Sequence, residues 1–239
     1  MQPVSEPTAC RRRAYYTTKR VVDVVVASSL LLIAAPVLLI VVLVVKLDSP
    51  GAVVFRQERL RGRRIVDEDG HVRWKIEPFT LYKIRTMVAG ADASPHQEYM
   101  TAYITGDEQW FTVRRDDRRP GDSYRPVRDP RLTRIGAVLR KLSLDELPQL
   151  WNVVKGDMSL VGPRPPMPYE AELYSKGELQ RLHTPCGLTG WAQVKGRCTV
   201  CFDDMVRLDL EYLRRQSVWL DLQILVRTIP VVLLRKGAG

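Results

Sequence analysis

The most prominent feature of the hydrophobic pattern is an apolar run near the start of the chain. It extends over 25 residues from Val21 to Val45, VVDVVVASSLLLIAAPVLLIVVLVV, and its only charged residue is Asp23. A helix of this length can cross the hydrocarbon core of a bilayer, which is ~30 Å thick. The run is too long for a signal peptide, and no small-residue cleavage site follows it. The pattern therefore predicts a membrane helix.

Basic residues flank this run on both sides, namely Arg11, Arg12, Arg13, Lys19 and Arg20 before it and Lys46, Arg56, Arg59, Arg61, Arg63 and Arg64 after it. Because positive charge favours the cytoplasmic side, both ends of the helix are expected there. A straight span cannot satisfy this, whereas a helix that enters, bends and returns can. Pro36 near the middle removes a backbone hydrogen bond, and Ser28 or Ser29 can pair with the freed groups. The alternative is a single-pass anchor with a tolerated proline, and composition alone does not separate the two.

The rest of the chain alternates short strand-like and helix-like stretches. FTLYKIRTM, Phe79–Met87, alternates and is rich in β-branched and aromatic residues, which predicts a strand that carries Lys83 and Arg85. A helix is expected from Ser94, which precedes Pro95. We further expect a strand-like run at 53–60 followed by a basic, polar stretch to about residue 74, helices at 131–142, at 169–182 and from about 203, and a glycine-punctuated strand or turn at 187–197. This mixture predicts an α/β (α+β) fold.

The last segment, SVWLDLQILVRTIPVVLLRKG at 217–237, is apolar and carries Arg227, Arg235 and Lys236. Such a segment can lie along a membrane surface. A core helix would show nearly the same composition, so both interpretations stay open at this point.

Net charge narrows the class of partner. The 239 residues include 37 Lys and Arg against 27 Asp and Glu, a formal charge of +10, which suits an anionic membrane face, a phosphorylated substrate or a nucleic acid. No recognised nucleic-acid-binding signature occurs, and the basic residues are scattered through mixed-charge segments, so nucleic acid is not expected as a partner. The four cysteines are too few and too unevenly placed for a disulfide framework, which favours a reducing compartment.

The candidate chemistry lies in LRKLSLDELPQLWNVVKGDMSLVGPRPP, residues 139–166. Ser143 and Glu146 have the spacing of a capping box, in which the acids would only begin a helix. The other interpretation is catalytic. A carboxylate at a helix start close to Arg140 is expected to stay ionised, as a nucleophile must, and free helix amides favour phosphate. Adjacent helical side chains point ~100° apart, so Asp145 and Glu146 suit divided roles, one attacking and one holding a cation.

Arg164 in GPRPP is the second candidate. The prolines around it stiffen the backbone, and a fixed guanidinium fork suits a phosphate or a nucleobase edge. A surface loop arginine is the ordinary alternative.

Several motifs occur in the order of a known family: KRVVDVVVASSLLLIAAPVLL, LYKIRTM, DPRLTRIGAVLRKLSLDELPQLWNVVKGDMSLVGPRP, GLTGWAQVKGR and WLDLQILVRT. Together they resemble the bacterial sugar transferases, the monotopic phosphoglycosyl transferases, over most of residues 19–236. Many relatives have Ser where this chain has Ala35, before the helix-breaking proline. This departure leaves the bend to Pro36 and to Ser28 or Ser29.

The resemblance implies roles for individual residues. Asp145 would be the nucleophile and Glu146 the acid associated with Mg²⁺. Arg140 and Lys83 would bind phosphate, and Arg164 would bind the nucleotide.

The resemblance also implies the reaction and its location. A sugar 1-phosphate would pass from a UDP-sugar to polyprenyl (undecaprenyl) phosphate through a covalent aspartyl-phosphosugar, which initiates exopolysaccharide or other glycoconjugate synthesis. The enzyme would sit on the cytoplasmic face of the bacterial inner membrane, bound monotopically to the bilayer. Its expected organisation is a basic tail at 1–18, a re-entrant membrane helix at 19–48 and a cytoplasmic domain at 49–239 with amphipathic surface helices and a membrane-associated C-terminal helix. The oligomeric state is open, with a homodimer among the options.

Two other function classes are alternatives. A membrane-tethered nucleic-acid-binding regulator predicts salt-dependent DNA retention. A non-catalytic scaffold for polysaccharide export predicts that replacement of Asp145 leaves pathway output intact.

The cysteines offer one more pattern. HTPC and CTVC place His183, Cys186, Cys198 and Cys201 at a spacing compatible with a tetrahedral zinc site. Because the intervening GLTGWAQVKGR is a family motif that functions without metal, packed or surface free thiols are the expectation.

Overall fold

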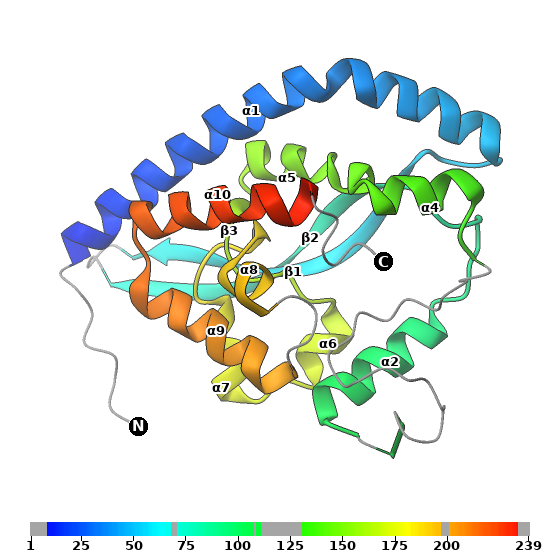
Figure 1. Cartoon of the computed structure of the whole chain (residues 1–239). Coiled ribbons are helices and arrows are strands. Elements are labelled where there is room, and N and C mark those ends of the chain that lie inside the picture. Colours follow the sequence, from blue (N-terminus) through cyan, green and yellow to red (C-terminus); the bar gives the residue numbers. More distant parts are fainter. Residues whose placement is uncertain (1–8, 68–70, 108, 111–130, 197–200, 234–239) are drawn as a thin grey trace.

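The computed structural model describes residues 9–67, 71–107, 109–110, 131–196 and 201–233 (Figure 1). Helices and strands are mixed within one chain, which confirms the predicted α+β class. The elements are α1 (Ala9–Asp48), β1 (Val54–Val66), β2 (Val72–Ile84), α2 (Ser94–Thr105), α4 (Arg134–Lys141), η1 (Leu144–Glu146), α5 (Gln149–Lys155), β3 (Ser159–Val161), α6 (Pro168–Glu172), α7 (Lys176–Leu179), η2 (Gln180–Leu182), β4 (Gly187–Thr189), α8 (Trp191–Gly196), α9 (Phe202–Arg215) and α10 (Val218–Leu233).

A long antiparallel hairpin, β1 and β2, runs through the middle of the molecule, with α1, α4, α5 and α10 on one side and α2, α6, α7 and α9 on the other (Figure 1). Its register pairs Val54 with Ile84 and Val66 with Val72. The hairpin therefore includes the basic, polar stretch to which no element was assigned from the sequence, and β2 ends three residues before the predicted Met87. Strand pairing satisfies the backbone there, while Arg61 forms ion pairs with Glu77 and Asp157 at 2.8 and 2.9 Å.

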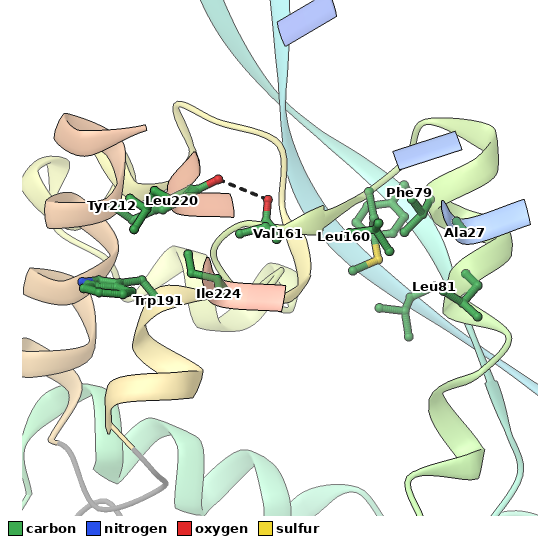
Figure 2. Close-up of a cluster of buried hydrophobic side chains, with 12 residues drawn as sticks. Ala27, Phe79, Leu81, Leu160, Val161, Trp191, Tyr212, Leu220 and Ile224 are labelled. Carbon is green, nitrogen blue, oxygen red and sulfur yellow. Dashed lines mark hydrogen bonds between the residues drawn. The ribbon is translucent and has the colours of Figure 1, made fainter. Parts of the chain in front are cut away.

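The main hydrophobic core joins the hairpin to the second half of the chain (Figure 2). Ala27 of α1 lies beside Phe79 and Leu81 of β2 and beside Leu160 of β3. On the other side of β3, residues of α8, α9 and α10 complete the cluster: Trp191, Tyr212, Leu220 and Ile224. The short parallel pair of β3 and β4 is thus held in the core. Strand β3 leads directly into the loop that carries Arg164.

Helix α1 is continuous through Pro36, without the break that was expected at this residue, and it is curved along its length (Figure 1). It begins at Ala9, so half of the segment expected as a tail is helical. Residues 13–48 are long and apolar enough to cross a membrane, with a mean hydropathy of 3.0 in their most apolar window. Two of the basic residues that were counted as flanking charges, Lys19 and Arg59, are buried inside the protein.

Both halves of α1 contact the same domain. In the first half, the Lys19 ammonium donates to the Val161 carbonyl and pairs with Asp221 of α10, both at 2.8 Å. In the second half, Val41 and Val45 pack against Ile84 and Leu139. The middle of the helix instead exposes large apolar side chains, among them Leu32, Ile33, Leu39 and Ile40.

Helix α10 has two apolar faces. Leu220 and Ile224 are buried in the core. Trp219, Leu222, Val226 and Ile229 follow helical spacing on an exposed face, and Trp219 is 70% exposed. One face of this helix is therefore a core face, as the core-helix interpretation predicts. Contact of the other, exposed face with a membrane surface stays a prediction.

Candidate functional site

Asp145 and Glu146 lie in η1, a single 3₁₀ turn between α4 and α5. The capping-box interpretation is wrong, because the Ser143 side chain forms no cap hydrogen bond and its backbone has a left-handed φ of 55°. Ser143 is the one non-glycine residue with positive φ within the described ranges. Such strain is characteristic of functional sites, where the surrounding packing maintains it. The acidic pair is therefore held by a tight irregular connection and not by a helix start.

The two acids have different surroundings. The Asp145 residue is 8% exposed, whereas the Glu146 side chain is 44% exposed. Burial raises the pKa of Asp145, and the neighbouring Glu146 raises it further, while Lys83 and Arg140 act in the opposite direction. Desolvation therefore outweighs the two cations, whereas the expectation that Asp145 stays ionised considered only the charge of Arg140. The ionised state itself stays a prediction. The expected difference in environment between the acids is present.

Lys83 reaches the acidic pair from the C-terminal end of β2. Its ammonium lies 3.1 Å from the Glu146 carboxylate. Lys83 and Glu146 are 63 positions apart in the sequence, and the fold brings them into contact.

Arg140 is positioned by the close packing of α4 on the segment after β2. Thr133 caps α4 by accepting a hydrogen bond from the Gly136 amide at 2.9 Å. A Cβ at Gly136 would lie 1.9 Å from the Thr86 carbonyl oxygen, so only glycine permits this approach. The Arg140 Nε then donates to the Thr86 hydroxyl at 3.0 Å. This packing places the guanidinium within electrostatic reach of Asp145.

Arg164 lies on the loop after β3 and is exposed, whereas the prolines beside it are buried. Arg59 of β1 supports this loop by donating to the Pro165 carbonyl at 3.0 Å. Burial, and after it the nearby charge of Arg164, lowers the pKa of Arg59 to about 10. Sequence analysis had treated Arg59 only as a flanking charge, so its place in the site was missed.

His96 of α2 lies within electrostatic reach of both Arg140 and Arg164. Burial lowers its pKa to about 4, and four arginines add to this effect: Arg164, Arg59, Arg131 and Arg140. Arg131 also donates to the Asp92 carbonyl just before α2, at 2.6 Å. Arg140 thus lies within electrostatic reach of both Asp145 and His96, and Arg164 and Arg59 lie within reach of His96. No sequence signal had singled out His96 or Arg131.

The acidic pair also bears on the expected Mg²⁺. Within the described ranges, no group of three or more His, Cys, Asp or Glu side chains is placed to hold a metal. Mg²⁺ commonly takes only one or two carboxylates from a protein and completes its shell with water and substrate phosphates. The exposed carboxylate of Glu146 beside Asp145 fits that mode of binding.

The cysteine pattern is spread over different surroundings. Cys186 is fully buried and its thiol faces the Leu60 carbonyl, whereas His183 and Cys201 are exposed. Cys198 lies outside the described residues.

The chain is similar in sequence to several known proteins. The exopolysaccharide production protein ExoY of Rhizobium meliloti is 36% identical over 195 residues, which cover 82% of this chain and 76% of ExoY. An undecaprenyl-phosphate galactose phosphotransferase of Salmonella typhimurium is 41% identical over 160 residues, 67% of this chain and 31% of that protein. A UDP-glucose:undecaprenyl-phosphate glucose-1-phosphate transferase of Xanthomonas campestris is 35% identical over 204 residues, 81% of this chain and 34% of that protein.

The chain therefore spans about three quarters of ExoY and about a third of the other two relatives. The sequence model described as bacterial sugar transferase matches residues 14–235, which include most of α1, the acidic pair and the Arg164 loop. The match extends over most of the chain, and this protein is a member of the bacterial sugar transferase family.

Proposed function

We propose that this protein transfers a sugar 1-phosphate from a UDP-sugar to undecaprenyl phosphate, a step that initiates exopolysaccharide or other glycoconjugate synthesis. The observation that carries the proposal is a buried carboxylate, Asp145, within electrostatic reach of Lys83 and Arg140, in a member of this family. A nucleotide diphosphate sugar is a polyanion of matching charge. Relatives named for transfer to undecaprenyl phosphate support the same assignment.

The proposed reaction has two displacements at phosphorus. A carboxylate oxygen of Asp145 attacks the sugar-bearing phosphorus, a new O–P bond forms, and the P–O bond to UMP breaks. A phosphate oxygen of undecaprenyl phosphate then attacks the same phosphorus, and the aspartyl O–P bond breaks to regenerate the carboxylate. Burial of Asp145 supports this role, because a desolvated carboxylate loses the hydration shell that would shield it.

The surrounding cations have positioning and electrostatic roles. Lys83 and Arg140 lie near enough to Asp145 to lower its pKa and to neutralise phosphoryl oxygens in front of it. Arg164 holds the nucleotide end of the donor. Mg²⁺ bound by Glu146 and donor phosphate oxygens would supply further charge neutralisation on the diphosphate.

The proposed location is the cytoplasmic face of the membrane, with a monotopic, re-entrant α1. Two observations support it. Both halves of α1 pack on one domain, whereas its middle exposes apolar residues. Helix α10, which lies on the same side of the hairpin as α1, also exposes large apolar side chains (Figure 1).

The test is turnover by the purified, membrane-reconstituted protein. A panel of UDP-sugars is supplied with and without undecaprenyl phosphate, and released nucleotide is identified by mass. We expect acceptor-dependent turnover that releases UMP with at least one donor. Release of UDP instead would mean that the sugar moves without its phosphate, which contradicts the proposal.

A further inference from the structure

The nucleotide end of the site holds two polar side chains that the proposed reaction does not use. They are His96 of α2 and Tyr169 of α6, two helices that contact each other and lie side by side in Figure 1. Both residues lie in the charge field of Arg164 and Arg59. The two side chains therefore lie within electrostatic range of the guanidinium that would hold the donor.

Tyr169 carries an unexplained polar atom. Its hydroxyl oxygen is buried, and it has no hydrogen-bond partner among the described residues. Native structures pair nearly all such atoms, because an unpaired buried hydroxyl costs free energy. Burial raises the pKa of this phenol to about 12, so it remains a neutral hydroxyl that can donate. A ligand group next to Arg164 would satisfy it.

His96 is neutral in the same surroundings. Its imidazole is half-buried, and its pKa of about 4 means that one ring nitrogen donates and the other accepts at neutral pH. Among the arginines around it, which only donate, His96 supplies an acceptor.

We propose that His96 and Tyr169 bind the nucleobase end of the donor beside Arg164 and set its preference for uracil. The pairing edge of uracil has two carbonyl oxygens on either side of an N–H. Arg164 and Tyr169 can donate to the carbonyls, while neutral His96 accepts from the N–H. Cytosine has an amino group and an unprotonated ring nitrogen in place of one carbonyl and the N–H, so it mismatches these groups. This inference rests on the proposed function, since it assumes a nucleotide donor.

Steady-state kinetics with matched variants test the proposal. Tyr169→Phe removes only the hydroxyl, and we expect the KM for the UDP-sugar to rise about tenfold while kcat stays within about twofold. His96→Gln should raise KM and lower the preference for the UDP-sugar over the CDP-sugar with the same sugar. The controls are Gln97→Ala and Glu172→Gln, exposed neighbours on the same two helices, which should match the wild type.

Chemical footprinting of the unmodified protein gives a second readout that needs no substitution. Diethyl pyrocarbonate modifies accessible imidazoles, and the chain has three histidines. UDP should protect His96, whereas exposed His71 and His183 should react equally with and without UDP.

The outcomes separate the two proposals. A wild-type protein without UMP release from any UDP-sugar would sink the proposed function itself. An active wild-type protein whose variants keep its KM and nucleotide preference, or whose His96 gains no protection from UDP, would overturn the nucleobase assignment alone. A loss confined to kcat would also overturn it, since it would indicate a structural role.

Discussion

Asp145 shows most directly how one residue depends on its surroundings. The carboxylate that we propose as the nucleophile is buried beside Glu146, and both conditions raise its pKa. A charge held in such a place costs folding free energy in exchange for reactivity. Ser143 adds a left-handed backbone two residues earlier.

The first prediction concerns Asp145→Asn. We expect activity to fall by more than about 10³-fold, because the amide cannot act as the nucleophile. The melting temperature should rise by a few degrees, since the variant buries no charge. The wild type, quenched with a UDP-sugar and no acceptor, should carry a phosphosugar adduct on the Asp145 peptide by mass spectrometry, with ping-pong kinetics. Ternary-complex kinetics without an adduct would require direct transfer instead.

The second prediction concerns pH. Asp145 must be ionised to attack, so kcat/KM should fall as pH decreases through its pKa, which burial raises above the ordinary value of about 3.9. Lys83→Met removes a charge that lowers this pKa, so the acid limb should move to higher pH. Glu146→Gln removes a charge that raises it, so the limb should move to lower pH. Rate profiles of UMP release measure both, and shifts in the same direction would contradict the assignment of this limb to Asp145.

At the scale of elements, buried polar contacts fix the helices that flank the core. Lys19 of α1 reaches Asp221 of α10 and the Val161 carbonyl, and Asp23 accepts from the Leu160 amide at 2.9 Å. Tyr212 of α9 donates to the same Asp221 at 2.8 Å. These contacts tie α1 to the strand that precedes the Arg164 loop.

The third prediction follows from this ion pair. Lys19→Met should destabilise the protein by about 3–5 kcal/mol, because it leaves the Asp221 carboxylate buried without its cation. Adding Asp221→Asn should restore part of the loss. Thermal denaturation of the two single variants and the double variant forms the cycle, with the exposed Arg207→Met as control. Additive losses would show that the two residues are not coupled.

At the scale of the whole molecule, three helices that lie on the same side of the hairpin each expose large apolar side chains (Figure 1). Helix α1 exposes its middle, α10 exposes Trp219 and Val226, and α5 exposes Trp151. Since large contiguous apolar surface is rare on soluble monomers, these faces fit contact with a bilayer. The acidic pair lies between α4 and α5, on the same side of the hairpin as α1 (Figure 1).

The fourth prediction concerns topology. Single cysteines at Ser5 and Ala238 of a cysteine-free variant should both resist an impermeant thiol reagent in intact cells and react after permeabilisation. This follows from a re-entrant α1, which returns both ends to the cytoplasm. Pro36→Leu restores the missing backbone donor, so it should straighten the helix and make part of the N-terminal probe reactive in intact cells. Reaction of the N-terminal probe alone in the parent protein would indicate a conventional span.

Local sequence determined several features of this protein. The length and composition of the run from Val21 to Val45 predict a long apolar helix, and this prediction does not depend on how the rest of the chain folds. Alternation located β2, and the motif around Asp145 and Glu146 located the acidic pair. These features depend on neighbours within a few residues, which a pattern records.

Tertiary structure decided what those residues experience. Only folding brings Lys83 within 3.1 Å of Glu146, buries Arg59 under the Arg164 loop, and places His96 among arginines from distant segments. It also raises the pKa of Asp145 by burying the carboxyl, and it turns a capping-box pattern into a strained connection. The physical reason is that desolvation and electrostatic energy depend on what packs around a group, and that packing comes from parts of the chain far away in sequence.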